Sequence, residues 1–111
     1  MEYGAAKAAL SNFCKALSKE VGKHDIRVNT VSPGAVATDL WLGRAGIAES
    51  IAHVAGLQAA AVAQQAAKGS VTARFTRPEE VADLVLLLAC DRAGNLDGID
   101  VVIEGGTLTT I

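Results

Sequence analysis

The sequence predicts an α/β fold with a parallel sheet, and three observations support this prediction. Over residues 3–21, apolar residues recur at helical spacing. Segment 26–34 is rich in β-branched residues and ends in Pro-Gly, as short strands often do. Segment 99–106 has the same character and closes on two glycines. Because a short loop joins the first helix to segment 26–34, we interpret the pair as the αβ part of a βαβ unit, whose strands are parallel.

Length and charge limit the classes of protein that the chain resembles. Its 111 residues, of which 50% are hydrophobic, suit one small domain. The formal net charge of −2 leaves no basic stripe for a nucleic acid or an anionic membrane. The longest apolar run, 84–90, is too short to cross a bilayer, and no signal segment opens the chain. We therefore expect a cytoplasmic protein with no membrane partner.

No metal site is predicted. Cys14 and Cys90 are isolated, without CxxC spacing or a paired histidine, and are expected to be buried free thiols.

The first helix is expected to bury one face. Its apolar stripe consists of Leu10, Cys14, Leu17 and Val21, and Gly22 is the expected carboxyl-terminal cap. In the following strand, Asn29 is expected to make structural hydrogen bonds.

Residues 39–70 are helical in composition but interrupted by glycines. The breaks are expected at Gly43, Gly46, Gly56 and Gly69. We predict several short helices with a weak apolar stripe.

A clearer helix follows. Thr76 and Glu79 fit a capping box, and Pro78 suits the first turn. Its predicted buried face consists of Val81, Leu84, Val85 and Leu88. The predicted order is therefore helix, strand, helices, strand, with no strand before the first helix, which is half of an architecture.

Tyr3 and Lys7 are four residues apart, so they share one helix face. Lys7 falls close to the apolar stripe, where an ammonium is costly unless its charge is needed. An ammonium about 4 Å from a phenol stabilises the phenolate by about 4 kcal/mol at an effective dielectric constant of 20. Such a pair exchanges protons near neutral pH. Alone the motif is weak, and the alternative is a tyrosine at a helix start with a lysine reaching into solvent.

Four segments, in order, give the motif its context: "YGAAKAAL", "IRVNTVSPGAVATDL", "RFTRPEEVADLVLLLA" and "LDGIDVVIEGG". With these segments the chain resembles the short-chain dehydrogenase/reductase family over essentially its whole length. The resemblance implies the carboxyl-terminal half of a Rossmann-type, doubly wound parallel sheet. It also implies three parts: the catalytic helix and the strand with its Pro-Gly turn (1–38), the substrate lid (39–75), and the last helix and strand (76–111).

The resemblance also assigns roles. Tyr3 matches the catalytic tyrosine, which donates a proton in carbonyl reduction or accepts one in alcohol oxidation. Lys7 matches the lysine that activates this tyrosine and hydrogen-bonds the nicotinamide ribose. The implied cofactor is NAD or NADP.

Further cofactor contacts are implied at the end of the first strand. Pro33 and Gly34 match the turn that brings backbone close to the nicotinamide. Val36 matches the position whose backbone contacts the carboxamide, and Thr38 matches the hydroxyl that reaches the carboxamide or the pyrophosphate. For Thr38 the alternative is an N-cap of the next helix. Trp41 either covers an apolar substrate or packs in the core.

The family's other half is expected to be missing, including its glycine-rich dinucleotide loop and catalytic serine. The predicted function is NAD(P)-dependent hydride transfer between nicotinamide and a carbonyl or alcohol. The isolated half is expected to be inactive. The predicted partners are a small-molecule substrate and, in addition, either a second copy in a homo-oligomer or a complementary amino-terminal half. The alternatives are a non-catalytic dimerisation fragment and a truncated pseudogene product. The substrate, the reaction direction and the choice between NAD and NADP are unreadable from this sequence.

Overall fold

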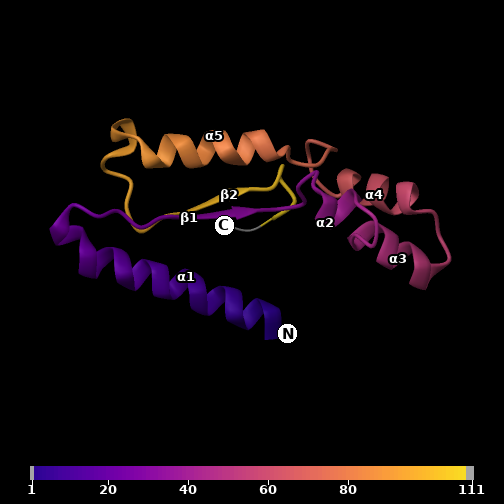
Figure 1. Cartoon of the computed structure of the whole chain (residues 1–111), viewed down its shortest axis with the longest axis horizontal. Coiled ribbons are helices and arrows are strands. Elements are labelled where there is room, and N and C mark those ends of the chain that lie inside the picture. The colour runs from indigo at the N-terminus through magenta and orange to yellow at the C-terminus, as the bar shows by residue number, and fades with distance from the viewer. Residues whose placement is uncertain (1, 110–111) are drawn as a thin grey trace. The chain divides into compact units, whose positions relative to one another are not determined.

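The computed structural model describes residues 2–109, which form seven regular elements and two 3₁₀ turns (Figure 1). Two strands form one sheet, in agreement with the predicted fold class. The elements in chain order are α1 (Glu2–Val21), η1 (Gly22–His24), β1 (Thr30–Pro33), α2 (Asp39–Leu42), α3 (Ile47–Ala55), α4 (Ala59–Lys68), α5 (Pro78–Ala89), η2 (Asp91–Ala93) and β2 (Asp100–Ile103).

The strands β1 and β2 are parallel. The Thr30 amide donates to the Ile99 carbonyl at 2.9 Å, and the Gly34 amide donates to the Ile103 carbonyl at 3.0 Å. Both partners advance by four residues in the same direction, which is the register of a parallel pair. The predicted sheet type is therefore confirmed.

The chain divides into two compact units. The first contains residues 1–32 and 83–102, and the second contains residues 33–82 and 103–111. In the first unit, α1 lies on one side of the strands and the carboxyl-terminal part of α5 lies on the other (Figure 1).

Helix α1 has the predicted extent, but its cap is different. The chain continues past Val21 into the 3₁₀ turn, and Asp25, with φ 59°, takes the left-handed conformation. Its amide donates to the Gly22 carbonyl at 3.1 Å. The prediction of Gly22 as the cap is wrong, because one further turn forms before the chain reverses, and aspartate tolerates this conformation.

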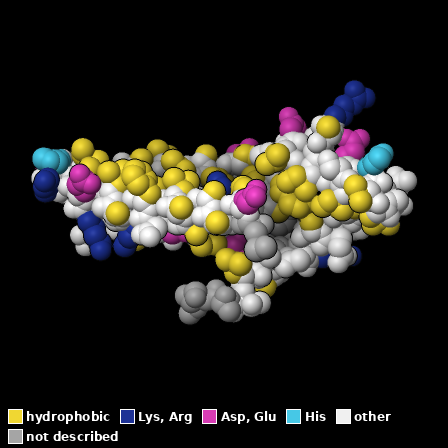
Figure 2. Space-filling model, turned by 90° about the horizontal axis from the view of Figure 1, so that it is seen from below, with side chains coloured by type: hydrophobic (Ala, Val, Ile, Leu, Met, Phe, Trp, Pro, Cys, Tyr) yellow, Lys and Arg dark blue, Asp and Glu magenta, His cyan; other side chains and the backbone are white. Residues whose placement is uncertain are grey.

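The apolar stripe of α1 is only partly buried in the described residues, where Leu17 and Val21 are half-buried. Leu10 is 51% exposed, Cys14 is half-buried and neighbouring Phe13 is 61% exposed. Figure 2 shows hydrophobic side chains gathered on the surface over α1. The expected burial of this face is therefore met only in part within the first unit. An apolar surface of this kind is typical of an interaction site.

Strand β1 begins at Thr30, four residues later than predicted. Before Thr30, side-chain hydrogen bonds take the place of several backbone hydrogen bonds between the strands. The Val28 amide donates to Asp97 Oδ1 at 2.8 Å. Asn29 Nδ2 donates to the Leu96 carbonyl at 2.8 Å, and Asn29 Oδ1 accepts from the Ile99 amide at 3.2 Å. The structural role predicted for Asn29 is confirmed.

Arg27 organises the carboxyl-terminal end of α5. Its Nη1 donates to the carbonyls of Leu88 at 2.7 Å and Ala93 at 3.1 Å. Weaker contacts reach the Leu96 carbonyl at 3.3 Å and, from Nη2, the Cys90 carbonyl at 3.4 Å. A helix leaves its last carbonyls without intrahelical partners, and a cation suits this end of the helix dipole. Arg27 therefore caps α5 from a distant part of the chain.

In the second unit the predicted helix breaks at Gly43, Gly46, Gly56 and Gly69 are confirmed. Gly56 ends α3 in the left-handed conformation, with φ 66°, which glycine adopts at little cost.

The predicted capping box of α5 is displaced by one residue. Glu80, not Glu79, accepts a hydrogen bond from a preceding backbone amide, that of Arg77, at 2.8 Å. Thr76 is buried, and its backbone pairs with Val36 in an isolated parallel bridge instead of capping the helix. Leu88 of the predicted apolar face is buried, whereas Val85 is 49% exposed.

The start of α5 makes a pH-dependent contribution to stability. A hydrogen bond from Arg74, followed by the one from the Arg77 amide, lowers the pKa of Glu80 from 4.5 to about 2. Because the folded pKa is the lower one, this stabilisation is present above pH 4.5 and is lost as the pH falls toward 2. We expect Glu80→Gln to flatten the fall in the free energy of unfolding between pH 5 and 2, measured by urea titration.

The matched control is Glu79→Gln, which removes the neighbouring carboxylate and leaves the contacts of Glu80 with Arg74 and Arg77 in place. Equal pH slopes for the two variants would show that Glu80 is not responsible.

Among the described residues, no single helix has the length and apolarity needed to cross a membrane. The stretches Asp39–Ala55 and Ala59–Lys68 meet these criteria only as a pair, and the pair is bent by 107°.

Candidate active site

The first turns of α1 bring Tyr3 and Lys7 together. Lys7 Nζ lies 5.5 Å from the centroid of the Tyr3 ring. The tyrosine is 77% exposed, and Lys7 is exposed as well. The one-turn spacing therefore places the Lys7 ammonium over the Tyr3 ring, and both side chains lie at the surface and not on a buried face. An ammonium acts more weakly on a phenol there than in a water-excluded site, because water and salt screen its charge.

The end of β1 holds Pro33 and Gly34 against β2 and the residue after it. A Cβ added at Gly34 would lie 2.6 Å from Glu104 Cβ and 3.0 Å from Glu104 Cα. Any larger residue would push the two chain segments apart. In the described residues, glycine is thus required by internal packing, a role that the sequence analysis had not considered.

Beyond this turn, Val36 forms a parallel bridge with Thr76. The Thr76 amide donates to the Ala35 carbonyl, and the Ala37 amide donates to the Thr76 carbonyl, both at 2.9 Å. The polar groups of successive residues in such a bridge point in opposite directions. The Val36 amide therefore faces away from Thr76.

Thr38 lies on the same side as the polar groups of Val36. Its amide donates to the Val36 carbonyl at 2.8 Å, and its hydroxyl approaches the same oxygen at 3.5 Å. Thr38 stands at the N-cap position of α2, but its side chain makes no capping hydrogen bond. The predicted N-cap position of Thr38 is therefore confirmed, although its hydroxyl makes no capping hydrogen bond.

These groups fit the carboxamide of a nicotinamide. A carboxamide carries one carbonyl acceptor and two N–H donors. The outward Val36 amide would hold the carbonyl, and the Thr38 hydroxyl oxygen would accept from the NH₂ group. The donor set at the end of β1 is thus compatible with the implied cofactor.

The two groups of predicted residues belong to different units. Tyr3 and Lys7 are in the first unit, and Pro33, Gly34, Val36 and Thr38 are in the second. Each group is brought together within its own unit, and their roles stay predictions.

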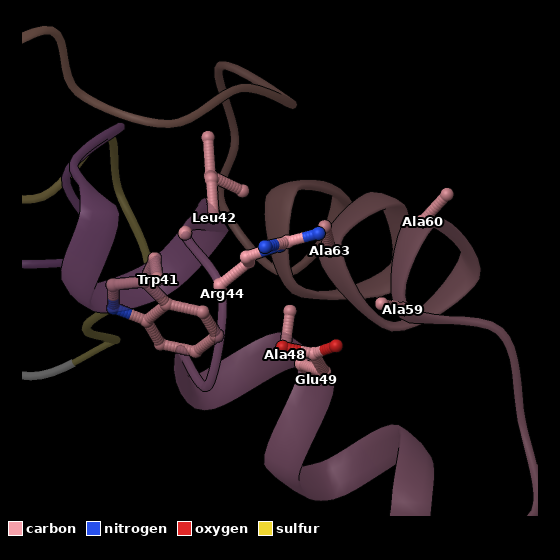
Figure 3. Close-up of a pocket in the computed structure, with 9 residues that line it drawn as sticks. Trp41, Leu42, Arg44, Ala48, Glu49, Ala59, Ala60 and Ala63 are labelled. Carbon is pink, nitrogen blue, oxygen red and sulfur yellow. The ribbon is translucent and has the colours of Figure 1, made fainter.

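A cavity lies in the second unit, within the segment expected to form the substrate lid (Figure 3). Its volume is about 330 Å³, and its wall includes Trp41. The Trp41 ring also packs on Phe75, with ring centroids 5.5 Å apart and an angle of 59° between the planes. The same ring therefore packs on Phe75 and lines a cavity, and its role toward a substrate stays a prediction.

The sequence analysis missed Arg44 and Glu49, the two charged residues that line this cavity. The available signal was the pair Gly43 and Gly46, which encloses Arg44 in a short turn. Glycines at this spacing indicate a constrained loop, and such loops often present functional side chains.

The family described as Enoyl-(Acyl carrier protein) reductase matches residues 1–108. The short-chain reductase protein NovJ of Streptomyces niveus is 35% identical over 104 residues, which are 94% of this chain and 37% of NovJ.

Two solved structures extend the comparison. L-sorbose reductase from Gluconobacter frateurii, complexed with NADPH and L-sorbose, has a TM-score of 0.87 and 34% identity over 98% of this chain and 41% of its own. 4-Hydroxyisoleucine dehydrogenase complexed with NADH has a TM-score of 0.77 and 27% identity over 98% of this chain and 40% of its own.

Together these proteins define a class of NAD(P)-dependent oxidoreductases with a Rossmann fold. The chain belongs to the short-chain dehydrogenase/reductase family, which confirms the resemblance seen in its motifs. It spans less than half the length of these relatives.

Proposed function

We propose that the chain supplies the proton-transfer residues and part of the nicotinamide site of an NAD(P)-dependent oxidoreductase. The reaction is hydride transfer between nicotinamide and a carbonyl or alcohol. The observation that carries this proposal is the contact of the Lys7 ammonium with the Tyr3 ring, at 5.5 Å, on successive turns of α1.

Tyr3 acts as the acid or base in this proposal. In reduction its hydroxyl gives a proton to the oxygen of the substrate carbonyl, and in oxidation the phenolate takes the proton from the alcohol. Lys7 holds a positive charge beside the phenol, which favours the ionised form.

The second unit holds the nicotinamide in this proposal. The Val36 amide and the Thr38 hydroxyl orient its carboxamide, while the Pro33–Gly34 turn keeps the backbone close to the nicotinamide. When bound, the cofactor supplies or accepts the hydride. The relatives include one complex with NADPH and one with NADH, so both forms are candidates.

The proposal also requires a partner segment. Tyr3, Leu10 and Phe13 are exposed on α1, and a site that strengthens charge effects must exclude water. We therefore propose that this face of α1 packs against the part of the family domain that the relatives contain and this chain does not match.

A complementation experiment tests the proposal. The chain is co-expressed with a segment carrying the glycine-rich loop of a relative, and consumption of NADPH or NADH is followed at 340 nm with carbonyl substrates. Co-purification of the two segments and carbonyl-dependent turnover are expected. Stable co-purification without turnover would contradict the catalytic proposal and favour the association fragment.

In this complemented protein, Lys7→Met is expected to lower turnover at pH 7 by about 10- to 1,000-fold. The loss of one ammonium removes roughly 4 kcal/mol or less of phenolate stabilisation, depending on how far the site is shielded from water. Because the phenol then ionises less readily, the rate of alcohol oxidation should recover as the pH is raised toward 10.

Lys19→Met, on the same helix three turns further on, is the control and should leave the pH–rate profile unchanged. A profile that is the same for Lys7→Met and for the unmodified protein would refute the role of Lys7.

A further inference from the structure

The cavity of the second unit carries an inference about the substrate. Its volume of about 330 Å³ lies at the lower end of the range for small-molecule sites. Most of its wall is apolar, with a single cation and a single carboxylate among the lining residues. The lining includes Trp41, Leu42, Arg44, Glu49, Ala60 and Ala63.

The turn that carries Arg44 is held by close backbone packing. A Cβ at Gly43 would lie 2.6 Å from the Asp39 carbonyl oxygen, and one at Gly46 would lie 2.7 Å from the Gly43 carbonyl oxygen. Between them Ala45 adopts the left-handed conformation, with φ 58°. Strained backbone of this kind persists where its surroundings hold it, often at functional sites. The backbone that presents Arg44 is therefore well defined.

The two charges of the cavity are not equally available. The Glu49 carboxylate accepts a hydrogen bond from the backbone amide of Ala45, so one of its oxygens is already occupied by the turn. Arg44 has no ion pair or side-chain hydrogen bond with any residue in the described range 2–109. Figure 3 shows its side chain extending from the turn toward α4.

Helix α4 adds to the positive character of this wall. Its first residues, Ala59 and Ala60, line the cavity, and its first turn contains no acidic residue. The amides at a helix start carry partial positive charge. The inference itself rests on Arg44 and the apolar cavity, and the helix start reinforces it.

We propose that Arg44 selects a substrate in which a carboxylate is joined to a short apolar chain. This rests on the proposed function, since it names the class of carbonyl or alcohol compound that the oxidoreductase would accept. The guanidinium would bind the carboxylate through two parallel N–H···O bonds. The apolar part would lie against Trp41 and the alanines of α4, where its burial is favourable.

A binding experiment without cofactor tests this proposal. Trp41 is the only tryptophan of the chain, so tryptophan fluorescence reports on the surroundings of this one ring, which include the cavity. The probes are hexanoate and 1-hexanol, which share the apolar chain and differ in the anionic group. We expect hexanoate to change the fluorescence with a dissociation constant at least tenfold lower than that of hexanol.

Variants of the two charged residues sharpen the test. Arg44→Gln is expected to weaken hexanoate binding about 10- to 100-fold, the range for a hydrogen bond to a charged group, and to leave hexanol binding unchanged. Arg44→Lys keeps the positive charge but lacks the planar guanidinium, so its affinity for hexanoate should lie between those of the unmodified chain and Arg44→Gln. Glu49→Gln still offers an oxygen to Ala45, and by removing the opposing charge it should strengthen hexanoate binding. Lys68→Gln, at the far end of α4, is the matched control.

Equal affinities for hexanoate and hexanol, equal loss of both in Arg44→Gln, or no response of Trp41 to either probe would overturn the proposal. Because no hydride transfer is involved, this result is independent of the complementation assay. Tight hexanoate binding through Arg44 combined with absent turnover would refute the proposed function and leave this anion site standing.

Discussion

Tyr3→Phe is expected to reduce carbonyl-dependent turnover of the complemented protein by about 10²- to 10⁴-fold, the usual contribution of a positioned acid or base. The substitution removes only the hydroxyl that gives or takes the proton. The ring that Lys7 contacts stays in place. The loss should appear in kcat and in kcat/KM alike, because the proton is transferred only in the chemical step.

The fold and the cofactor site provide the controls for this variant. Tyr3 is 77% exposed, so removing its hydroxyl should leave the free energy of unfolding within about 0.5 kcal/mol of its original value. The dissociation constant for NADPH, measured by fluorescence, should also be unchanged. Turnover that survives Tyr3→Phe undiminished would refute the assignment of the proton-transfer role.

Arg27→Met is expected to lower the free energy of unfolding by about 3 kcal/mol, the upper range for hydrogen bonds to a charged group. The variant keeps an apolar stem of similar length but leaves the carbonyls of Leu88 and Ala93 without their donor. It also removes the positive charge at the carboxyl end of α5. Urea titration of the chain measures the change.

Two further variants isolate the cause. Arg27→Lys should recover only part of the stability, because an ammonium lacks the planar fork that reaches several carbonyls. Arg92→Met alters an exposed arginine of the neighbouring η2 turn and should be nearly neutral. If Arg27→Met and Arg92→Met have equal effects, the capping role of Arg27 is wrong.

Hydrogen exchange offers a second measurement. Loss of the Arg27 contacts should speed exchange of the amides near the end of α5, such as that of Cys90, more than amides in the middle of α1. Uniform acceleration throughout the chain would indicate a general loss of stability instead.

Features that depend on neighbouring residues were predictable. Four glycines divided the helical segment where expected, since glycine weakens a helix wherever it stands. Tyr3 and Lys7 make contact because residues four apart share a helix face. The family resemblance depended on motifs of the same local kind.

Features that depend on residues far apart in the sequence could not be predicted from it. Thr76 and Glu79 predict the start of α5, where Glu80 accepts the hydrogen bond instead. The carboxyl end of the helix is capped by Arg27, more than 60 residues away in the sequence. No periodicity in the sequence indicates such hydrogen-bonded pairs, because they form only when separate elements pack together.

The sequence by itself predicted the helices, their breaks and the two strand segments, because each follows from spacing and backbone preference within a few residues, and its four motifs indicated the family by resemblance. The packed structure was needed to place Arg27 on the carbonyls beyond α5, to press Gly34 against Glu104, and to gather Arg44 with Trp41 around one cavity. The physical reason is that hydrogen bonds and close contacts are made between surfaces, and which surfaces meet depends on how the whole chain packs.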